Sequence, residues 1–436
     1  MKNKKMWFII GGIIIVLALV ISIFLIFTNN KNSNVKLEKV WNLSYGDEIT
    51  PDMYEDEDLN FAEDDGDKSF VSIDKNNEGY VLVGTNGENS FVEQGIIEYY
   101  DLNGKIQWTK KYPNIDSNNW EVTSGFKDVM AVKDGYIVIG YEDGDGPEFE
   151  DGYQNAIIIK YDLNGNLIWS KKYNTLISTS NLNNNLSYDL IDIISINEKY
   201  YIVGNLTEYL ITQEGEQIGF TADKKYGFII ELDSNGNEIS LNKYREGSEF
   251  FSAKVVDNKI TINSLLGYEL VDTDEYFYGT AEGLGLLVFD GNNFDQIIKY
   301  AESSDGYGIL YDNYKDFVFL DGVYYFVDPT TVGKILAIDK DGNEKFSMHA
   351  DDGDELDNYW LQNITTDGEN IYVYAYYYDM FESNEMTDSV ILVFDKDCNY
   401  KMVDIDEQYY YQIVFKDNSL LLPGSENSFA KYKINR

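Results

Sequence analysis

The hydrophobic positions of this chain fall into short apolar runs, separated by polar turns, that recur along most of its length. The run Ile96–Tyr112 (IIEYYDLNGKIQWTKKY) returns as Ile157–Tyr173 (IIIKYDLNGNLIWSKKY). Beyond residue 27 the runs show no helical period, and the whole chain contains only five prolines. Runs of this length that end in turn residues predict β-strands. A repeat of roughly 50 to 70 residues made of strands and turns predicts a β-propeller or a similar array.

Each repeat divides into four runs, which in the first repeat are Phe70–Ile73, Tyr80–Val83, Ile96–Tyr100 and Lys105–Tyr112. The connections between the first and second runs, and between the third and fourth, are tight turns rich in Asn-Gly and Asp-Gly. These dipeptides tolerate the positive φ that hairpin turns require. The Asp-x-Asn-Gly element is interpreted as a turn rather than a calcium loop, because its glycine comes too early for an EF-hand.

The last repeat has only three runs, and its missing outer run lies near the other end of the sequence. Val40–Tyr45 places Trp41 and Tyr45 at the same spacing as Trp108 and Tyr112. A ring closed by strands from both ends leaves no open sheet edge. The sequence therefore predicts an all-β fold, a seven-bladed β-propeller over residues 39–436 closed by the N- and C-terminal strands. Six or eight blades stay open, because the fourth and seventh repeats are degenerate.

A stretch of 21 uncharged, mostly apolar residues, Trp7–Phe27, precedes the repeats. As a helix it is about 30 Å long, the thickness of the hydrocarbon core of a bilayer. Lysines before it predict that residues 1–6 stay in the cytoplasm. We therefore expect a single-pass cell-membrane protein with a transmembrane helix at 7–27, a linker at 28–38 and an extracytoplasmic propeller. A cleavable signal peptide is the alternative, but no small-residue cleavage site follows Phe27.

The chain is strongly acidic, with 76 Asp and Glu against 34 Lys and Arg and a formal net charge of −42. Such a surface repels nucleic acid and attracts cations and basic proteins. We therefore expect no nucleic-acid partner, and a membrane partner only through residues 7–27. Solubility alone is the alternative explanation of the charge.

The remaining connections are long, acidic and rich in tyrosine, and alternating strand direction places them all on one face. Long loops that share a rim commonly carry binding sites. Our candidates for ligand binding are Asp143, Asp145, Glu148, Asp352, Asp354, Tyr276 and Tyr359. Among them Asp143, Asp145 and Glu148 form a possible Ca²⁺ site, since Ca²⁺ takes several oxygen ligands. Solvated surface loops are the alternative interpretation of these segments, which include Asn205–Tyr226 and Ser264–Gly285.

The spacing of Asp101, Gly104 and Trp108, repeated at 162, 165 and 169, resembles the repeats of the quinoprotein-like (PQQ-like) bacterial β-propeller superfamily. The resemblance implies the propeller fold. The quinone-dependent dehydrogenases of that superfamily have more regular tryptophan docking, and some have a vicinal cysteine pair. This chain has neither feature, so we expect no PQQ and transfer no dehydrogenase activity.

Few residues of this chain suit catalysis by histidine or cysteine, because His349 and Cys398 are the only ones of their kinds. Ser-His-Asp, Cys-His and multi-His metal sites are therefore disfavoured. The sequence favours a binding or scaffold module for a basic protein or an envelope ligand such as a glycan. A carboxylate-based enzyme acting on glycans is the main alternative, since it needs only two acidic residues at a suitable distance. A sensor subunit that reports to a membrane partner is another.

Overall fold

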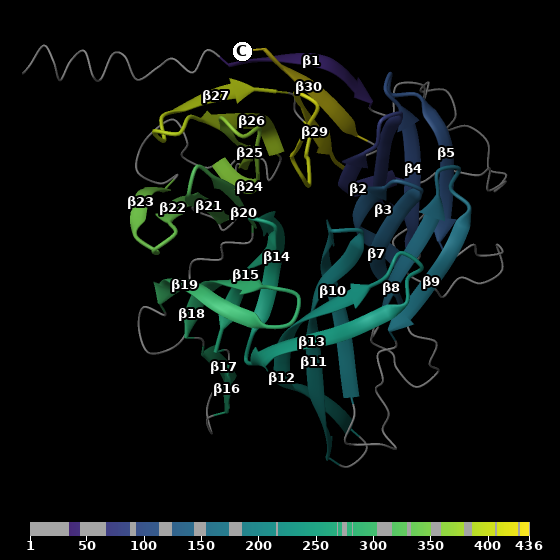
Figure 1. The fold of residues 1–436 in the computed structure, drawn as a ribbon, viewed down its shortest axis with the longest axis vertical. Helices are drawn as coiled ribbons and strands as arrows, with labels where there is room; N and C mark the ends of the chain where they lie inside the picture. The colour runs from purple at the N-terminus through teal and green to yellow at the C-terminus, as the bar shows by residue number, and fades with distance from the viewer. Residues whose placement is uncertain are drawn as a thin grey trace, which may run out of the picture.

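The described part of the chain is an all-β wheel of seven four-stranded antiparallel sheets arranged around one axis, a seven-bladed β-propeller (Figure 1). The computed structural model describes residues 35–43, 67–87, 93–112, 124–143, 154–173, 185–214, 217–267, 269–272, 277–280, 282–302, 316–328, 333–349, 359–378, 386–405, 408–425 and 428–435. The predicted fold and blade number are confirmed.

Six blades are built from strands that follow one another in sequence, from the innermost to the outermost. Blades 1 and 2 contain β2 (Asp67–Lys75), β3 (Gly79–Gly87), β4 (Glu93–Asp101) and β5 (Ile106–Tyr112), then β6 (Ser124–Val132), β7 (Gly135–Asp143), β8 (Gln154–Asp162) and β9 (Leu167–Tyr173). Blades 3 and 4 contain β10 (Asn185–Ile196), β11 (Lys199–Glu214), β12 (Gln217–Leu232) and β13 (Glu238–Glu246), then β14 (Glu249–Val256), β15 (Lys259–Leu266), β18 (Gly283–Phe289) and β19 (Phe294–Glu302). Blades 5 and 6 contain β20 (Asp316–Leu320), β21 (Val323–Asp328), β22 (Lys334–Asp339) and β23 (Glu344–His349), then β24 (Tyr359–Thr366), β25 (Ile371–Tyr378), β26 (Met386–Phe394) and β27 (Tyr400–Asp404).

The seventh blade joins the two ends of the described chain. It contains β28 (Val414–Lys416), β29 (Ser419–Pro423), β30 (Phe429–Asn435) and, as its outermost strand, β1 (Lys36–Leu43). Lys39 lies opposite Tyr432, and after a bulge Trp41 lies opposite Lys431, as the closure prediction requires. The Trp41 ring packs on Phe429 and on Tyr80 of blade 1, with ring centroids 4.6 and 5.8 Å apart. Closure therefore combines a backbone ladder with an aromatic contact to the first blade.

Apolar side chains fill the spaces between neighbouring blades in seven clusters, each drawn from two adjacent blades. In one of them, Ile139 of blade 2 packs with Ile202 and Phe228 of blade 3. The strands are apolar on both sides because each inner sheet is covered by a neighbour on both faces. Burial of these side chains is the main force that holds the blades together.

The predicted tight turns have the geometry expected of them. Asp101 accepts hydrogen bonds through Oδ1 from the backbone N–H groups of Asn103 and Lys105, at 2.9 and 3.0 Å. Gly104 has φ of 83°, and Cys398 takes the glycine's place in blade 6 with φ of 62°. These contacts confirm the interpretation of Asp-x-Asn-Gly as a turn.

One turn also contacts the preceding blade. Trp108 of blade 1 donates its Nε1–H to the carbonyl oxygen of Leu163 in the blade 2 turn, at 3.2 Å. A Cβ at Gly165 would lie 2.9 Å from the Trp108 ring, and the φ of Gly165 is +74°. Only glycine fits there without strain.

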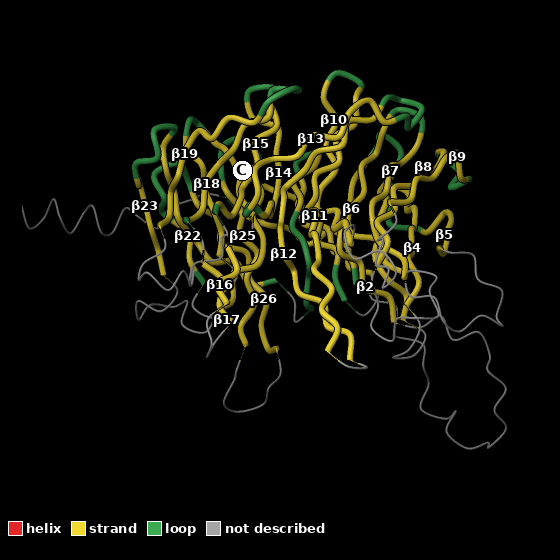
Figure 2. Tube along the Cα trace, turned by 90° about the horizontal axis from the view of Figure 1, so that it is seen from below, coloured by secondary structure: helices red, strands yellow, loops and turns green. Residues whose placement is uncertain are grey.

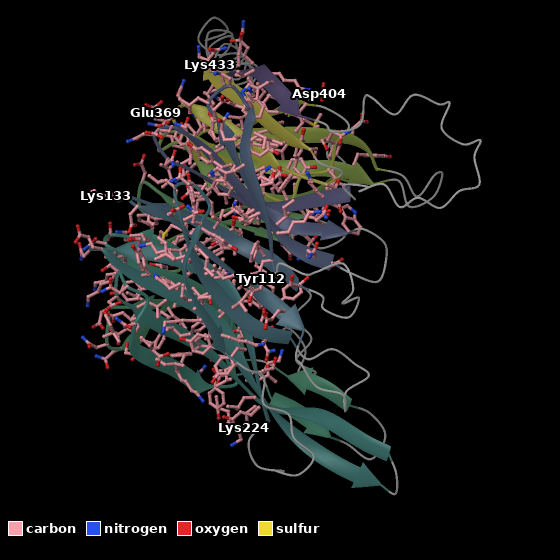
Figure 3. All side chains as sticks on the ribbon, turned by 90° about the vertical axis from the view of Figure 1, so that its right-hand side faces the viewer. Tyr112, Lys133, Lys224, Glu369, Asp404 and Lys433 are labelled. Carbon is pink, nitrogen blue, oxygen red and sulfur yellow. The ribbon has the colours of Figure 1, made fainter. Side chains whose placement is uncertain are left out.

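The tight turns all lie on one face of the wheel (Figure 2). Lys133 and Glu369, from the inner turns of blades 2 and 6, both lie on this turn face (Figure 3). The long connections join strand ends on the opposite face. We call these two surfaces the turn face and the connection face.

Two of the connections expected to be loops contain β-structure instead. In blade 3, β11 and β12 stay paired as far as Glu214 and Gln217, so the expectation of a loop over Asn205–Tyr226 is wrong. Threonines and isoleucines in this segment suit the strand conformation. In blade 4, β16 (Glu269–Asp272) and β17 (Phe277–Thr280) form a two-stranded sheet within Ser264–Gly285.

The chain enters the propeller at the turn face. Lys36, the first residue of β1, pairs with Asn435. The adjacent Ile434 accepts a hydrogen bond from Asn418 Nδ2, in the inner turn of blade 7, at 2.8 Å. Residues 1–34, which include the predicted anchor, lie outside the described residues, and within the described ones no helix is long and apolar enough to cross a membrane.

Candidate functional site in the central channel

The blades each place one polar side chain at the same position, on the innermost strand or just before it. In five blades this residue directly follows a β-bulge in the pairing with the next strand. The seven residues, which we call the polar ring, are Ser72, Asp128, Asp192, Ser252, Asp316, Asn363 and Gln412. All except Ser72 line a cavity of about 530 Å³ in the central channel.

Three residues of the polar ring form hydrogen bonds to the following blade. An innermost strand has a sheet neighbour on one side only, so N–H groups on its other edge need partners from elsewhere. Asp128 Oδ2 accepts the N–H of Ile193 in blade 3 at 3.1 Å, and Asp192 Oδ2 accepts that of Ala253 in blade 4 at 3.0 Å. Gln412 Oε1 accepts the N–H of Ile73 in blade 1 at 3.3 Å. In each case the donor directly follows the ring residue of the next blade.

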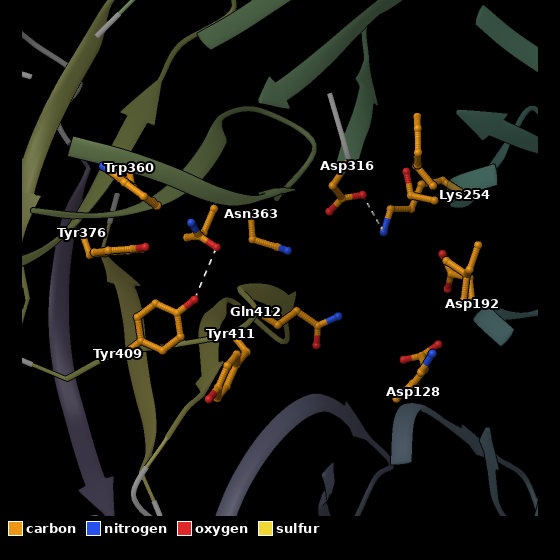
Figure 4. A pocket seen from close by; sticks show the side chains of 15 residues that line it. Asp128, Asp192, Lys254, Asp316, Trp360, Asn363, Tyr376, Tyr409, Tyr411 and Gln412 are labelled. Atoms are coloured by element: carbon orange, nitrogen blue, oxygen red, sulfur yellow. Dashed lines mark hydrogen bonds and ion pairs between the residues drawn. The ribbon is translucent and has the colours of Figure 1, made fainter. Parts of the chain in front are cut away.

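Three carboxyl groups and one ammonium form what we call the acidic wall of the cavity: Asp128, Asp192, Asp316 and Lys254. Lys254 Nζ lies 3.2 Å from Asp316 Oδ1 (Figure 4). Ser72 Oγ donates to Asp128 Oδ1 at 2.6 Å. Each of these side chains therefore already has a partner in the wall or in the adjacent blade.

The acidic wall has strongly perturbed electrostatics. Burial raises the pKa of Asp128, and the charge of Asp192 raises it further. Burial likewise raises the pKa of Asp192, against the opposing effect of Lys254. For Lys254 burial lowers the pKa, but Asp316, Asp192 and Asp128 together outweigh burial and leave the pKa raised. Because 39% of the Lys254 side chain is exposed to solvent in the open cavity, solvent weakens these interactions relative to those of a fully buried cluster.

Four aromatic side chains form the opposite, aromatic wall: Trp360, Tyr376, Tyr409 and Tyr411. They come from blade 6 and from the segment that leads into blade 7, and they lie across the cavity from the acidic wall (Figure 4). Neighbouring ring centroids along this wall lie 5.9, 5.1 and 4.9 Å apart. The Tyr409 hydroxyl donates to Gln362 Oε1 at 3.5 Å. The rings support one another and present a continuous apolar surface with polar edges.

Two side-chain amides lie between the walls, those of Asn363 and Gln412 (Figure 4). Within the described part of the chain, the Asn363 amide has no hydrogen-bond partner, and Gln412 uses its oxygen but not its nitrogen. An amide nitrogen has two donors, and the Asn363 oxygen can also accept. These groups and the Ser252 hydroxyl, which is buried without a hydrogen-bond partner among the described residues, are the cavity's uncommitted hydrogen-bonding capacity.

The residues predicted from sequence are only partly described. Asp143 ends β7 and Tyr359 begins β24, both at the connection face. The Tyr359 ring lies 5.5 Å from that of Tyr377, and its pKa is raised by burial first and then by Asp388 and Asp404. The other candidates, Asp145, Glu148, Tyr276, Asp352 and Asp354, lie outside the described residues. No group of three or more His, Cys, Asp or Glu within the described ranges could hold a metal, and the Ca²⁺ site stays a prediction.

The sequence analysis did not find the polar ring. In blades 2 and 5 the ring residue lies one position before an apolar run, Asp128 before Val129–Val132 and Asp316 before Phe317–Leu320, so it falls outside the apolar pattern that predicts the strands. Aligning the repeats on their inner turns would have placed a polar residue in the same column of every blade. That column is the signal that identifies the channel lining.

Comparison with known proteins supports the fold and nothing finer. No family model matches the chain, and no curated protein matches it. An ulvan lyase of polysaccharide lyase family PL25, bound to -[GlcA(1-4)Rha3S]-, is 10% identical over 85% of this chain and 95% of its own, with a TM-score of 0.53. BamB from Moraxella catarrhalis is 14% identical over 91% and 98%, with a TM-score of 0.44. Virginiamycin B lyase from Staphylococcus aureus is 12% identical over 92% and 99%, with a TM-score of 0.46. At these identities the likeness shows a shared propeller fold, and membership of the quinoprotein-like superfamily stays a prediction.

Proposed function

We propose that this chain is a membrane-anchored, extracytoplasmic binding module that holds a protein or envelope ligand at its connection face. The apolar segment 7–27, preceded by lysines, supports the anchor. Since β1 enters the propeller at the turn face, an anchor at 7–27 would hold that face toward the membrane. The connection face and its acidic segments would then point away from the cell.

The cavity in the central channel is the observation that carries the proposal. Its volume of about 530 Å³ lies within the range of small-molecule sites. It combines an aromatic wall with the Asn363 amide, which has no partner among the described residues, and the Gln412 amide, whose nitrogen has none among them. Contacts that only hold neighbouring blades together would require neither an aromatic wall nor amide groups with unused donors.

Photo-crosslinking in intact cells tests this function with the full-length chain. A photoreactive amino acid at position Tyr411 or Tyr359 is expected to yield a defined adduct, and one at Lys133 on the turn face is the control. Adducts of the same kind at all three positions, or only at Lys133, would contradict binding at the connection face. A protease added outside the cells should cleave within residues 144–153, and protection of that segment would contradict the orientation.

An enzyme acting on glycans is the second candidate, and one observation favours it. Asp128 and Asp192 lie close enough for the charge of Asp192 to raise the pKa of Asp128, and burial raises the pKa of both, which is the state that a general acid requires. The similar ulvan lyase was solved bound to a polysaccharide fragment. His349 ends β23, the outermost strand of blade 5, and so is not on a strand that lines the channel. Release of new saccharide ends, abolished by Asp128→Asn, would establish catalysis, and binding without any product would exclude it for the saccharides tested.

Calcium remains part of the proposal through Asp143, Asp145 and Glu148. Ligands that bind only the folded state raise its melting temperature. A rise with Ca²⁺ that is lost in Asp145→Asn would support the site. No rise at millimolar Ca²⁺ would exclude it.

A further inference from the structure

We infer that the channel cavity is a saccharide site, selective for neutral sugars over charged ones. This inference rests on the proposed binding function and names the class of ligand. Three features of the cavity carry it: the balance of its charges, its free amides and its aromatic wall.

Each charged side chain that lines the cavity already has an ion-pair or hydrogen-bond partner within the protein. Lys254 pairs with Asp316, and Lys127, at the edge of the cavity, pairs with Asp189. Asp128 and Asp192 accept backbone N–H groups of the next blade. A cationic ligand would therefore have to compete for occupied carboxylates, and an anionic ligand would meet three of them. A neutral ligand meets neither obstacle.

The free hydrogen-bonding groups suit hydroxyls. Asn363 offers an acceptor and two donors, and Gln412 offers two donors. A sugar hydroxyl both donates and accepts, so it can pair with either kind of group. A ligand that only donates, such as an ammonium, would leave the amide nitrogens unpaired once it had displaced water from them.

The aromatic wall suits the other surface of a sugar. The C–H groups of a pyranose ring carry a slight positive charge and pack on the electron-rich faces of aromatic rings. The rings of Trp360 and Tyr411 both line the cavity, and Tyr409 stands perpendicular to Tyr411, so that pair supplies one ring face and one ring edge. The rings and the amides lie on adjoining parts of the cavity (Figure 4), so one sugar residue could contact both.

Isothermal titration calorimetry on the full-length chain, solubilised in a detergent without a sugar headgroup, tests the inference. The probes are neutral hexasaccharides of glucose, mannose and N-acetylglucosamine, a cationic glucosamine hexamer and an anionic galacturonate hexamer. The variants are Asn363→Ala and Tyr411→Ala. Asn242→Ala is the matched control, because Asn242 lies on β13, the outermost strand of blade 3, and within the described residues its side chain hydrogen-bonds only to Ser240.

At least one neutral hexasaccharide should bind more tightly than both charged probes, with little dependence on salt. Each channel variant should weaken that binding about 10-fold or more, and the control should leave it unchanged. Melting curves like that of the wild type would show that the variants are folded.

Three results would overturn the inference. Tightest binding of the glucosamine hexamer, weakened strongly by salt, would show that the carboxylates are available to a cation. Equal affinities in wild type and both channel variants would place the sugar elsewhere. If no saccharide binds while the crosslinks from Tyr411 persist, the saccharide class is wrong and the binding function stands; loss of both would end both proposals.

Discussion

The two walls of the central channel differ in whether their polar side chains already have partners within the protein. In the acidic wall, Asp128 and Asp192 accept backbone N–H groups of the next blade, and Lys254 neutralises Asp316. On the other side, Asn363 occupies the same ring position as Asp128 but has no partner among the described residues. Residues at equivalent positions in different blades therefore need not have the same role. Where the ring side chain is committed it stabilises the wheel, and where it is free it can serve a ligand.

The largest expected effect on stability is that of Lys254→Met. It leaves Asp316 and Asp192 without their cation, and because 39% of Lys254 is exposed we discount the value for a fully buried pair and expect a loss of about 2–3 kcal/mol in the free energy of unfolding. Urea denaturation measures it. Lys127→Met is the matched control, because Lys127 is about as exposed as Lys254 but its partner Asp189 is 53% exposed where Asp316 is 12% exposed, and it should lose less than about 1 kcal/mol. Equal losses would show that the acidic wall is no more than a solvated surface.

Asp128→Ala should have the next largest effect. It leaves the Ser72 hydroxyl and the Ile193 N–H without their acceptor, so we expect a loss of about 2 kcal/mol. Asp128→Asn retains one acceptor oxygen and should lose about half as much or less. If both variants are as stable as the wild type, the contact between blades 2 and 3 does not depend on this side chain.

The pH dependence of stability should distinguish the acidic wall from an ordinary surface. Because the folded pKa values of Asp128 and Asp192 are raised, the folded state keeps protons that the unfolded chain releases above about pH 4. Fewer bound protons in the unfolded state mean that stability falls as pH rises, until the folded pKa values are passed. As the pH rises above about 4, the wild type should therefore lose stability relative to Asp128→Asn. The exposed Asp397→Asn is the control, and a constant difference between wild type and Asp128→Asn would contradict the prediction.

The smallest effect on stability should come from the free amide. Asn363→Ala should change the free energy of unfolding by less than about 0.5 kcal/mol, since no hydrogen bond to the described chain is lost. Asn205 is the matched comparison, because its side-chain amide has partners for both of its polar atoms. Its Oδ1 accepts the N–H of Phe250 in blade 4 at 2.7 Å, and its Nδ2 donates to the Phe250 carbonyl at 3.0 Å. Asn205→Ala should lose about 2 kcal/mol. Similar losses for the two variants would remove the distinction between the walls.

The sequence predicted the fold well, because the fold depends on patterns that are local or repeated. Asp101 and Gly104 define a turn within four residues, and Trp41 matches the outer strands of other blades, so both the blades and their closure could be predicted. The expectation of a loop over Asn205–Tyr226 was wrong, because the segment was assigned from its length although Gly215 and the β-branched residues around it suit a hairpin. Asp145 and the other undescribed rim candidates stay predictions.

The channel site could not be predicted in the same way. Asp128 and Trp360 are 232 positions apart in sequence and meet only because the ring closes. Each is a single residue in a strand, and nothing local marks it as part of a cavity. Whether a ring residue is committed depends on the N–H group of the next blade, which is a property of the assembled wheel.

Hydrogen exchange of the full-length chain, with and without a bound neutral hexasaccharide, tests the central claim most directly. If the channel holds the ligand, exchange should slow at residues 360–363 and 409–412 and stay unchanged in the acidic segments 144–153 and 351–358. Slowing confined to those acidic segments would contradict the channel site and return the ligand to the rim.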